Sequence, residues 1–449
     1  PIYMFHDALV SFAERRVIFM ESIQNKIVKA ALLGAGTVGS GVYELVKERQ
    51  EDFPHICGTQ IEIAKILVRD ASKEREGIPS ELLTDNWKEI IADDSISIII
   101  EVMGGIEPAK SYLLEAMKAG KQVVTANKDL IAEHGHELLD TAEQYGCDFK
   151  FEAAVAGCVP IIQILKQSMS SENITEIMGI VNGTTNYILT RMTQSGLSYD
   201  EALKEATDLG YAEADPTADV DGLDAGRKIA IMASIAFHSR VTFSDVYIEG
   251  IRNITAKDIF YAKEFNSVIK LVGIARKDED GIEVKVLPIL IPQDHPLATV
   301  NDSFNAVFVH GTASDDTMYY GRGAGKRPTA SAVTGDLCTV ARHIVEKHSN
   351  LHVCSCYKEL PVKNIQDTYS RFFLRLQVAD RPGVLANITS VFGTSQVSIA
   401  QIIQKSRQNG NAELVIITDE VKELYFTDAL NILKRLSIVN SISSLIRVY

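Results

Sequence analysis

The sequence predicts an α/β protein made of a doubly wound domain, a second α/β domain and a small C-terminal domain. Apolar strands alternate with helices from residue 26 to about residue 150, which is typical of a parallel sheet covered on both faces. The pattern then becomes mixed, and the last part follows the β-α-β-β-α-β order of a ferredoxin-like unit. These changes place the main domain boundaries near residues 150 and 370.

A glycine fingerprint follows the first predicted strand. The apolar run from Ile27 to Leu33 leads into Gly34-x-Gly36-x-x-Gly39, and a predicted helix continues to about Arg49. Such glycines permit a tight turn and a close approach of the backbone to a pyrophosphate, while the helix N-terminus offers N–H donors. The pattern predicts a Rossmann-type dinucleotide-binding domain over residues 26–150. Its contacts to the cofactor would come from Gly34, Ala35, Gly36, Thr37, Val38 and Gly39.

Charged residues follow two later strands of this domain. Its further elements are predicted as strands at 61–68, 95–103 and 121–125 and a helix at 107–120. Arg69 and Asp70 follow the second strand; arginine there suits the 2'-phosphate of NADP, whereas Asp70 keeps NAD possible. Lys128 comes after the strand that ends at Thr125, at the sheet edge where open α/β sheets bind ligands.

The second domain is predicted over residues 151–320, and the chain then returns to the first domain at 321–345. Its elements are predicted as strands at 149–155 and 173–181, and as helices that begin at Pro160, at the capping box Ser198 to Glu201, and near Asp224. Residues 346–369 are polar and predict a linker. Residues 1–25 carry no motif and are treated as an N-terminal extension, either a surface helix or an appended segment.

The C-terminal domain is predicted over residues 370–449. Its strands are expected at 372–378, 398–404, 412–418 and 443–448, and its helices at 385–392 and 427–436. A turn, Asp380-Arg381-Pro382-Gly383-Val384, connects the first strand to the first helix.

The most informative stretch runs from Asn182 to Lys228. It opens with Asn182-Gly183-Thr184-Thr185-Asn186, and an acidic turn-rich segment follows. Asp224 and Lys228 are four residues apart and therefore share one helix face, which by itself could be a plain surface ion pair. Carboxylates can hold an ammonium group, and a lysine can act as acid or base. The segment thus predicts a site that binds an ammonium and moves a proton at an alcohol.

Four segments together closely resemble the homoserine dehydrogenase family. They are Val124–Lys128, Phe151–Gly157, Asn182–Ile188 and Gly210–Lys228, with Gly321–Gly325 and Pro328–Ala330 as further matches. The resemblance runs from about Lys26 to the end of the chain. It implies NAD(P)-linked interconversion of L-aspartate 4-semialdehyde and L-homoserine, a step in threonine, methionine and isoleucine biosynthesis.

The resemblance also implies roles for single residues. Lys228 would be the acid/base at the reacting oxygen, Lys128 a second acid/base or substrate-binding lysine, and Asp219 would orient a lysine or a water. Further members of the site would be Glu213 and Asp224 at the substrate ammonium, Gly183 and Thr184 lining the pocket, and Met103, Gly104, Ala126, Lys128 and Gly325 at the cofactor.

A sodium ion and an amino-acid effector are implied in the same way. The ion would bind at Glu152, Val155, Gly157 and Val159, mostly through backbone carbonyls, although this chain has Cys158 where a glycine is more usual. The C-terminal domain resembles an ACT domain through Val378–Leu385. Its effector would be L-threonine, bound between two such domains near Asp380, Gly383, Val384 and Asn387, in a homodimer or homotetramer.

Two other functions stay open at this point. One is an amino-acid sensor in which the dehydrogenase core is inactive, and the other is a different amino-acid dehydrogenase on the same scaffold. The ACT domain could also serve oligomerisation alone. Intact Lys128, Glu213, Asp219, Asp224 and Lys228 argue against the sensor.

Composition excludes several classes of protein. A net charge of −14 without a long basic run argues against nucleic-acid binding. No apolar run reaches the roughly 18 to 20 residues that a membrane span needs, and the first twenty residues lack a secretory pattern. The six cysteines include no C-x-x-C pair, so we expect reduced thiols and a cytoplasmic location.

Overall fold

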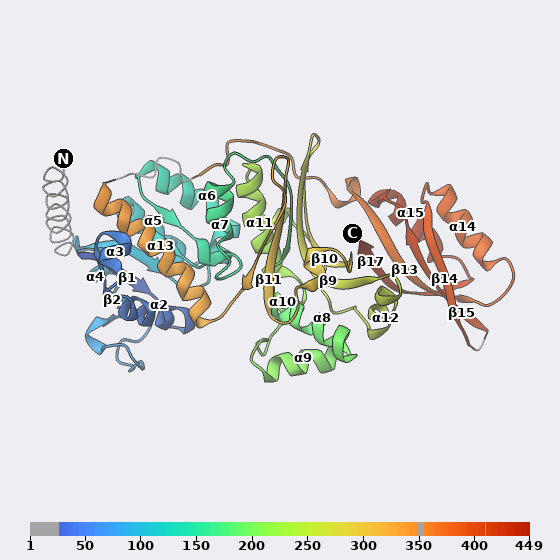
Figure 1. Cartoon of the computed structure of the whole chain (residues 1–449), viewed down its shortest axis with the longest axis horizontal. Coiled ribbons are helices and arrows are strands. Elements are labelled where there is room, and N and C mark those ends of the chain that lie inside the picture. The colour runs from blue at the N-terminus through green and yellow to red at the C-terminus, as the bar shows by residue number, and fades with distance from the viewer. Residues whose placement is uncertain (1–26, 348–353, 409) are drawn as a thin grey trace, which may run out of the picture. The chain divides into compact units, whose positions relative to one another are not determined.

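The computed structural model describes residues 27–347, 354–408 and 410–449 (Figure 1). The predicted N-terminal extension, residues 1–25, lies outside the described residues. Two compact units make up the chain. Unit 1 runs to Ile164 and resumes over Arg322–Ser355, and unit 2 comprises Leu165–Gly321 and Cys356–Tyr449.

Unit 1 is built on a six-stranded parallel sheet with the order β3-β2-β1-β4-β5-β6. Its strands are β1 (Ile27–Leu33), β2 (Gln60–Leu67), β3 (Leu83–Thr84), β4 (Ile96–Glu101), β5 (Gln122–Thr125) and β6 (Phe149–Lys150). The chain builds outward from β1 in one direction and then, from β4, in the other. A ligand is therefore expected outside the carboxyl ends of β1 and β4, where the strand order reverses.

Helices pack against this sheet. They are α2 (Thr37–Glu48), α3 (Phe53–Cys57), α4 (Trp87–Ile91), α5 (Ala109–Lys118), α6 (Lys128–Gln144) and α13 (Lys326–Glu346). Apolar side chains of α2 and α13 join the core of β1, β2 and β4. The two helices are closely packed, because a Cβ on Gly41 would lie 3.0 Å from the backbone oxygen of Lys326. The returning helix α13 thus supports the helix that follows the glycine loop.

One predicted strand of this unit is wrong. Residues 149–155 were expected to form a strand, but β6 stops at Lys150 and a 3-10 helix, Glu152–Ala154, follows. The backbone N–H of Glu152 donates to Asp336 of α13 at 2.8 Å rather than to a neighbouring strand. The apolar residues there are buried by this contact and not by a sheet, so their strand-like composition was misleading.

Unit 2 is built on an 11-stranded sheet. Its first part holds β7 (Ile174–Ile180), β8 (Tyr247–Ile248), β9 (Ser267–Asp278), β10 (Gly281–Pro292), β11 (Phe304–Gly311) and β12 (Asp315–Arg322). The helices associated with it are α8 (Gly183–Ser195), α9 (Tyr199–Asp208), α10 (Thr217–Val220), α11 (Leu223–Phe237) and α12 (Ala256–Glu264), and α7 (Ile161–Gln163) precedes them in unit 1. The capping box predicted at Ser198 and Glu201 is present at the start of α9.

The C-terminal part has the predicted β-α-β-β-α-β order. Its elements are β13 (Tyr369–Ala379), α14 (Val384–Thr394), β14 (Ile399–Gln408), β15 (Asn411–Thr418), the short β16 (Val421–Lys422), α15 (Glu423–Leu433) and β17 (Val439–Val448). One face of its sheet packs on α14 and α15, with Phe372 stacked on Phe426. Strand β17 also pairs in parallel with β10, so the two parts of unit 2 share one sheet. The sequence did not predict this continuity.

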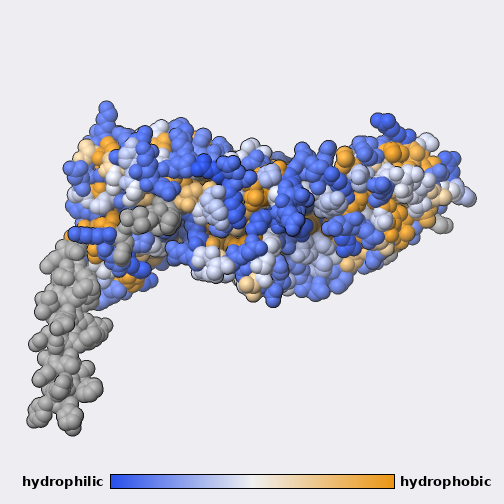
Figure 2. Space-filling model, turned by 90° about the horizontal axis from the view of Figure 1, so that it is seen from above, coloured by the Kyte–Doolittle hydropathy of each residue, from blue (hydrophilic) through white to orange (hydrophobic). Residues whose placement is uncertain are grey.

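The surface is of mixed polarity. On the face drawn in Figure 2, apolar side chains form separate patches among polar ones. In the part of the chain that the structure describes, no helix combines the length and hydrophobicity that crossing a membrane requires.

Candidate active site

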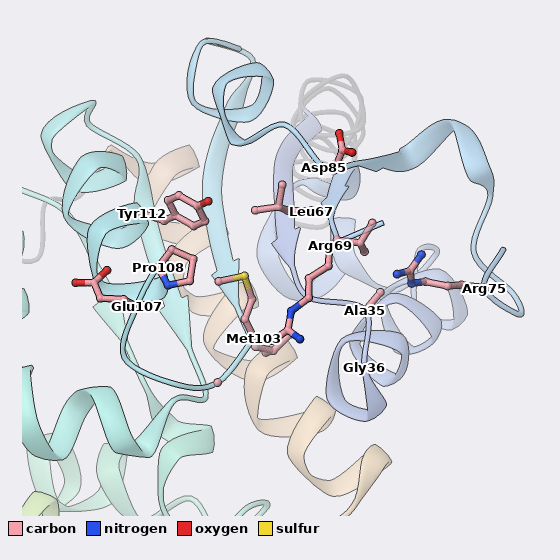
Figure 3. A pocket seen from close by; sticks show the side chains of 14 residues that line it. Ala35, Gly36, Leu67, Arg69, Arg75, Asp85, Met103, Glu107, Pro108 and Tyr112 are labelled. Carbon is pink, nitrogen blue, oxygen red and sulfur yellow. The ribbon is translucent and has the colours of Figure 1, made fainter. Parts of the chain in front are cut away.

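A pocket of about 530 Å³ lies where the parallel sheet reverses its strand order (Figure 3). One wall is the glycine loop, with Gly34, Ala35 and Gly36. Gly34 has a φ of +105°, which residues with a side chain rarely adopt. A Cβ on Gly39 would lie 2.1 Å from the carbonyl oxygen of Gly34, so only glycine fits there. The loop therefore offers a close backbone approach to a ligand.

Two guanidinium groups stand at the second wall, after β2. Arg69 and Arg75 both line the pocket, and Figure 3 shows them on the side of Ala35, across from Pro108 and Tyr112. Arg75 donates to the backbone oxygens of Asp70 at 3.1 Å and Lys73 at 2.8 Å, which orders the loop that carries it. Arg75 was not predicted from the sequence, because it lies in an irregular loop and belongs to no motif.

Asp70 does not line this pocket. Its carboxylate accepts hydrogen bonds from the hydroxyl of Ser72 at 2.6 Å and from the backbone N–H of Ser72 at 3.0 Å. These bonds hold the pKa of Asp70 below its usual value. The carboxylate that would favour a free ribose 2'-hydroxyl is thus engaged in a local turn.

A buried acid shapes the third wall. Glu101, the last residue of β4, accepts hydrogen bonds from the backbone of Met103 at 2.7 Å and Gly104 at 3.2 Å, and from the Thr125 hydroxyl at 2.6 Å. Burial raises the pKa of Glu101. Met103 and Gly104 line the pocket, as expected. An acid at the end of an otherwise apolar strand was a signal for this role that the sequence analysis did not use.

Other residues predicted to contact the cofactor do not line the pocket. They are Thr37, Val38, Gly39, Ala126, Lys128 and Gly325. Lys128 is the first residue of α6, and that helix is capped by the side chain of Asn127, which accepts from Leu130 N–H at 3.1 Å. Gly325 precedes α13 with a φ of +125°.

The predicted catalytic lysine lies in unit 2 and is buried. Lys228 is 8% exposed, and its Nζ donates to Asp224 Oδ2 at 2.7 Å and to the backbone oxygen of Val181 at 2.7 Å. Asp224 lies one turn earlier on α11 and is also buried. An exposed helix ion pair would be worth a few tenths of a kcal/mol. This pair is instead held in a dry environment, where its charges interact more strongly.

Asn182 connects this pair to the acidic turn, residues 210–222, which precedes α11. Its amide nitrogen donates to Asp219 Oδ1 at 2.6 Å and to Asp224 Oδ2 at 2.9 Å, and its amide oxygen caps α8 by accepting from Thr185 N–H at 2.9 Å. Burial raises the pKa of Asp219, and the negative charge of Asp224 raises it further. The structure thus brings Asp219, Asp224 and Lys228 together, with Asn182 as a link that the sequence analysis had not assigned.

Two of the other predicted substrate residues, Gly183 and Thr184, directly follow Asn182 at the start of α8. Gly183 begins α8, and a Cβ there would lie 2.9 Å from the backbone oxygen of Ser303. The hydroxyl of Thr184 donates to the backbone oxygen of Tyr211 at 2.6 Å, which ties α8 to the loop after α9. Glu213 is exposed on that loop and is not in the buried cluster.

The loop predicted to hold a cation is buried except at Cys158. The carboxylate of Glu152 is occupied, because it accepts from the backbone N–H groups of Ile162 at 2.8 Å and Gln163 at 2.7 Å. Ala156 and Gly157 both have a φ of +54°, and a Cβ on Gly157 would lie 2.4 Å from the backbone oxygen of Gly323. Cys158 is exposed, and its thiol donates to the backbone oxygen of Arg322 at 3.2 Å. Val155 and Val159 are buried neighbours in the loop.

A second pocket, of about 390 Å³, lies in the C-terminal domain at the turn between β13 and α14. Asp380, Gly383 and Val384 line it, as does Gln404 of β14, which the sequence analysis missed. Asn387 does not line it, although its amide donates to the backbone oxygen of Gly383 at 2.9 Å.

Comparison with protein families gives three matches. A family described as homoserine dehydrogenase matches residues 160–338, one described as homoserine dehydrogenase, NAD binding domain, matches residues 34–152, and one described as ACT domain matches residues 372–437.

Similar proteins carry the same description. A homoserine dehydrogenase of Bacillus subtilis is 45% identical over 427 residues, covering 94% of this chain and 98% of that protein. One of Corynebacterium glutamicum is 46% identical over 426 residues, covering 94% and 95%. A crystal structure of a homoserine dehydrogenase from Thiobacillus denitrificans is 38% identical with a TM-score of 0.89, covering 94% and 98%. A hyperthermophilic archaeal homoserine dehydrogenase mutant in complex with NADPH is 27% identical with a TM-score of 0.60, covering 70% and 97%.

Proposed function

Because the chain belongs to the homoserine dehydrogenase family, we propose that Lys228 protonates the substrate oxygen in the NAD(P)H-dependent reduction of L-aspartate 4-semialdehyde to L-homoserine. The observation that carries this role is the buried contact of Lys228 with Asp224 and the Val181 carbonyl. Hydride addition to the aldehyde carbon leaves negative charge on its oxygen. A positioned ammonium stabilises that charge and can then give up a proton.

The surrounding groups would bind and orient the substrate. Asp224 holds the ammonium of Lys228 in place, and Asp219, connected through Asn182, would orient the lysine or a water. Glu213, with Asp224, would hold the substrate ammonium, while Gly183 and Thr184 would line the pocket. Lys128, at the start of α6, would be a second acid/base or substrate-binding group.

The overall reaction is tested by NADPH oxidation on addition of L-aspartate 4-semialdehyde. A homoserine dehydrogenase consumes NADPH only when the aldehyde is present. A protein that senses amino acids without catalysis would consume none, and a different amino-acid dehydrogenase would respond to another carbonyl substrate.

We propose that the enzyme prefers NADP, because Arg69 and Arg75 line the pocket after β2 whereas Asp70 does not. Arg69→Ala should raise KM for NADPH by about 10-fold or more, since a hydrogen bond to a charged group contributes about 1.5–3 kcal/mol. KM for NADH should change little. Lys73→Ala, an exposed cation in the same loop, is the matched control. An unchanged KM for NADPH in the Arg69 variant would remove this preference.

We also propose a sodium ion at the loop of Glu152, Val155, Gly157 and Val159. Oxygen donors from a fixed backbone suit a hard cation. With the Glu152 carboxylate occupied, the donors would be mainly backbone carbonyls. When bound, the ion would hold the loop that Gly157 packs against Gly323. Activity should fall when sodium chloride is replaced by tetramethylammonium chloride at equal ionic strength, and equal activity in both salts would argue against the ion.

The C-terminal ACT domain is of a kind that binds amino-acid effectors, and we propose L-threonine as its effector in a homodimer or homotetramer. The second pocket, with Asp380 and the backbone at Gly383 and Val384, can take a small amino acid. L-threonine at about 100 times its Kd should raise the melting temperature by a few degrees and lower activity. D-threonine is the control. If L-threonine causes neither a shift in melting temperature nor inhibition, the remaining role of the ACT domain is oligomerisation, which analytical sedimentation would measure.

A further inference from the structure

A short segment of unit 2, Tyr247–Arg252, encloses the acidic turn that precedes Lys228. The backbone N–H of Ile251 donates to the Val220 carbonyl at 2.8 Å. A Cβ on Gly250 would lie 2.3 Å from that same carbonyl oxygen and 2.5 Å from the Cα of Asp221. The two backbones are therefore in direct contact, and the position of the segment is linked to that of the turn.

Side chains on both sides of Gly250 add to this contact. Arg252 forms an ion pair with Asp221 and donates to the Thr217 hydroxyl at 3.2 Å, at the start of α10. Ile248 packs against the start of α11, where a Cβ on Gly226 would lie 2.6 Å from its Cδ1. The segment thus holds α10 and the first turn of α11, the two elements that carry Asp219, Asp224 and Lys228.

The other side of the segment faces the ACT domain. Glu249 pairs with Arg447 of β17 at 2.8 Å and also accepts a hydrogen bond from the Tyr247 hydroxyl. Arg447 is 5% exposed and binds Glu423, the first residue of α15, through two hydrogen bonds of 2.6 and 2.8 Å. One buried guanidinium therefore joins an ACT helix to the segment that encloses the acidic turn.

The ACT strand that carries Arg447 is paired with the strand that reaches the second pocket. Arg447 stands opposite Phe372 of β13 in the sheet. At its other end, β13 contributes Val378 and Ala379 to that pocket. A ligand shifts a structure only by binding one arrangement better than another. An effector that favours one position of β13 and β17 would also favour one position of Arg447.

We propose that Tyr247–Arg252 is a positioning element for the substrate site, and that the Arg447–Glu249 pair makes its position depend on the effector state of the ACT domain. The proposal rests on the effector and substrate sites assigned above. Neither Glu249 nor Arg252 touches the reacting atoms; both act through the acidic turn.

The coupling is tested with Glu249→Gln, which removes the charge and keeps the shape of a side chain that is 35% exposed. L-threonine should still raise the melting temperature of this variant. Its inhibition should weaken about tenfold, within the range typical of coupling between sites. Glu420→Gln, at an exposed acid of the ACT domain, is the matched control and should be inhibited like the parent. Undiminished inhibition in Glu249→Gln overturns the proposal, and so does loss of threonine binding, which would make Glu249 part of the effector site.

The positioning role has its own test at exposed Arg252. Arg252→Ala should raise KM for aspartate semialdehyde about fivefold and leave KM for NADPH unchanged, and Arg252→Lys should recover part of the loss. Equal effects on both KM values, or none, overturn it. If the parent enzyme neither binds L-threonine nor is inhibited by it, the effector assignment fails, and the Arg252 variants alone decide the positioning role.

Discussion

Replacement of Lys228 by methionine is expected to lower kcat by about 1,000-fold, within the range that a positioned acid or base contributes. Methionine keeps most of the volume of a side chain that is 8% exposed, but it can neither stabilise the developing negative charge nor donate a proton. NADPH binding should survive, because the residues that line the pocket at the glycine loop all lie in unit 1, between Gly34 and Tyr112, whereas Lys228 lies in unit 2. Steady-state kinetics and a fluorescence titration with NADPH measure the two effects.

A matched control separates chemistry from folding. Lys204→Met removes an exposed lysine of α9 that stands 4.0 Å from Asp208, and it should leave kcat unchanged. In Lys228→Met, Asp224 keeps its hydrogen bond from Asn182, so its carboxylate is not left without a partner. Circular dichroism should therefore report a folded protein. A kcat within a few-fold of the parent value would exclude Lys228 as the acid. Lys128 would then be the lysine to test in that role.

The parts of the fold that were predicted correctly are determined by residues that lie close together in the sequence. The strand from Ile27 to Leu33 was predicted to the residue, because all of its residues except Lys29 are apolar, as is typical of a strand covered on both faces, and a glycine follows it. The capping box at Ser198 and Glu201 is likewise complete within four residues. The contact between Asp224 and Lys228 could be expected for the same reason, since helix geometry alone places them together.

The parts that were missed depend on contacts between distant residues. Asn182 reaches Asp219 and Asp224 across 37 and 42 residues, and no local pattern encodes that link. The segment after Lys150 has the composition of a strand, but a hydrogen bond to Asp336, 184 residues away, holds it elsewhere. Such partners follow from how elements pack, which local propensity does not determine.

The joint between the ACT sheet and α12 should be the most sensitive point for stability in unit 2. Arg375 of β13 is 6% exposed and pairs with Asp258 at 3.1 Å and with Glu413 at 3.2 Å. Both carboxylates are fully buried. Arg375→Met should lower the free energy of unfolding by about 3–5 kcal/mol, because the buried Asp258 loses its contact with the guanidinium and the buried Glu413 keeps only Lys257 as a cationic partner.

The pH dependence of this loss has a definite sign. Burial raises the pKa of Glu413, but hydrogen bonds from Lys257, Tyr261 and Arg375 outweigh it and hold the pKa below its usual value. A carboxylate with a lowered folded-state pKa stabilises the fold above its unfolded pKa, and that stability is lost as the pH falls through the folded value. Without the hydrogen bond from Arg375, the charged form of Glu413 contributes less to the free energy of unfolding. The difference between parent and variant should therefore be at its full size above about pH 4.3, the ordinary value for glutamate, and shrink as the pH falls below that value toward the lowered folded-state pKa.

Urea unfolding at about pH 7 and at a pH below about 4.3 measures both the size and the sign of this effect. Arg371→Met is the matched control, since it changes a partly exposed arginine four residues earlier on the same strand. Adding Glu413→Gln to Arg375→Met should recover part of the lost stability, because it removes one of the two buried charges that had lost their contact with Arg375. A loss no larger than that of the Arg371 variant, or one that grows as the pH falls, would mean that packing and not charge holds the ACT sheet on α12.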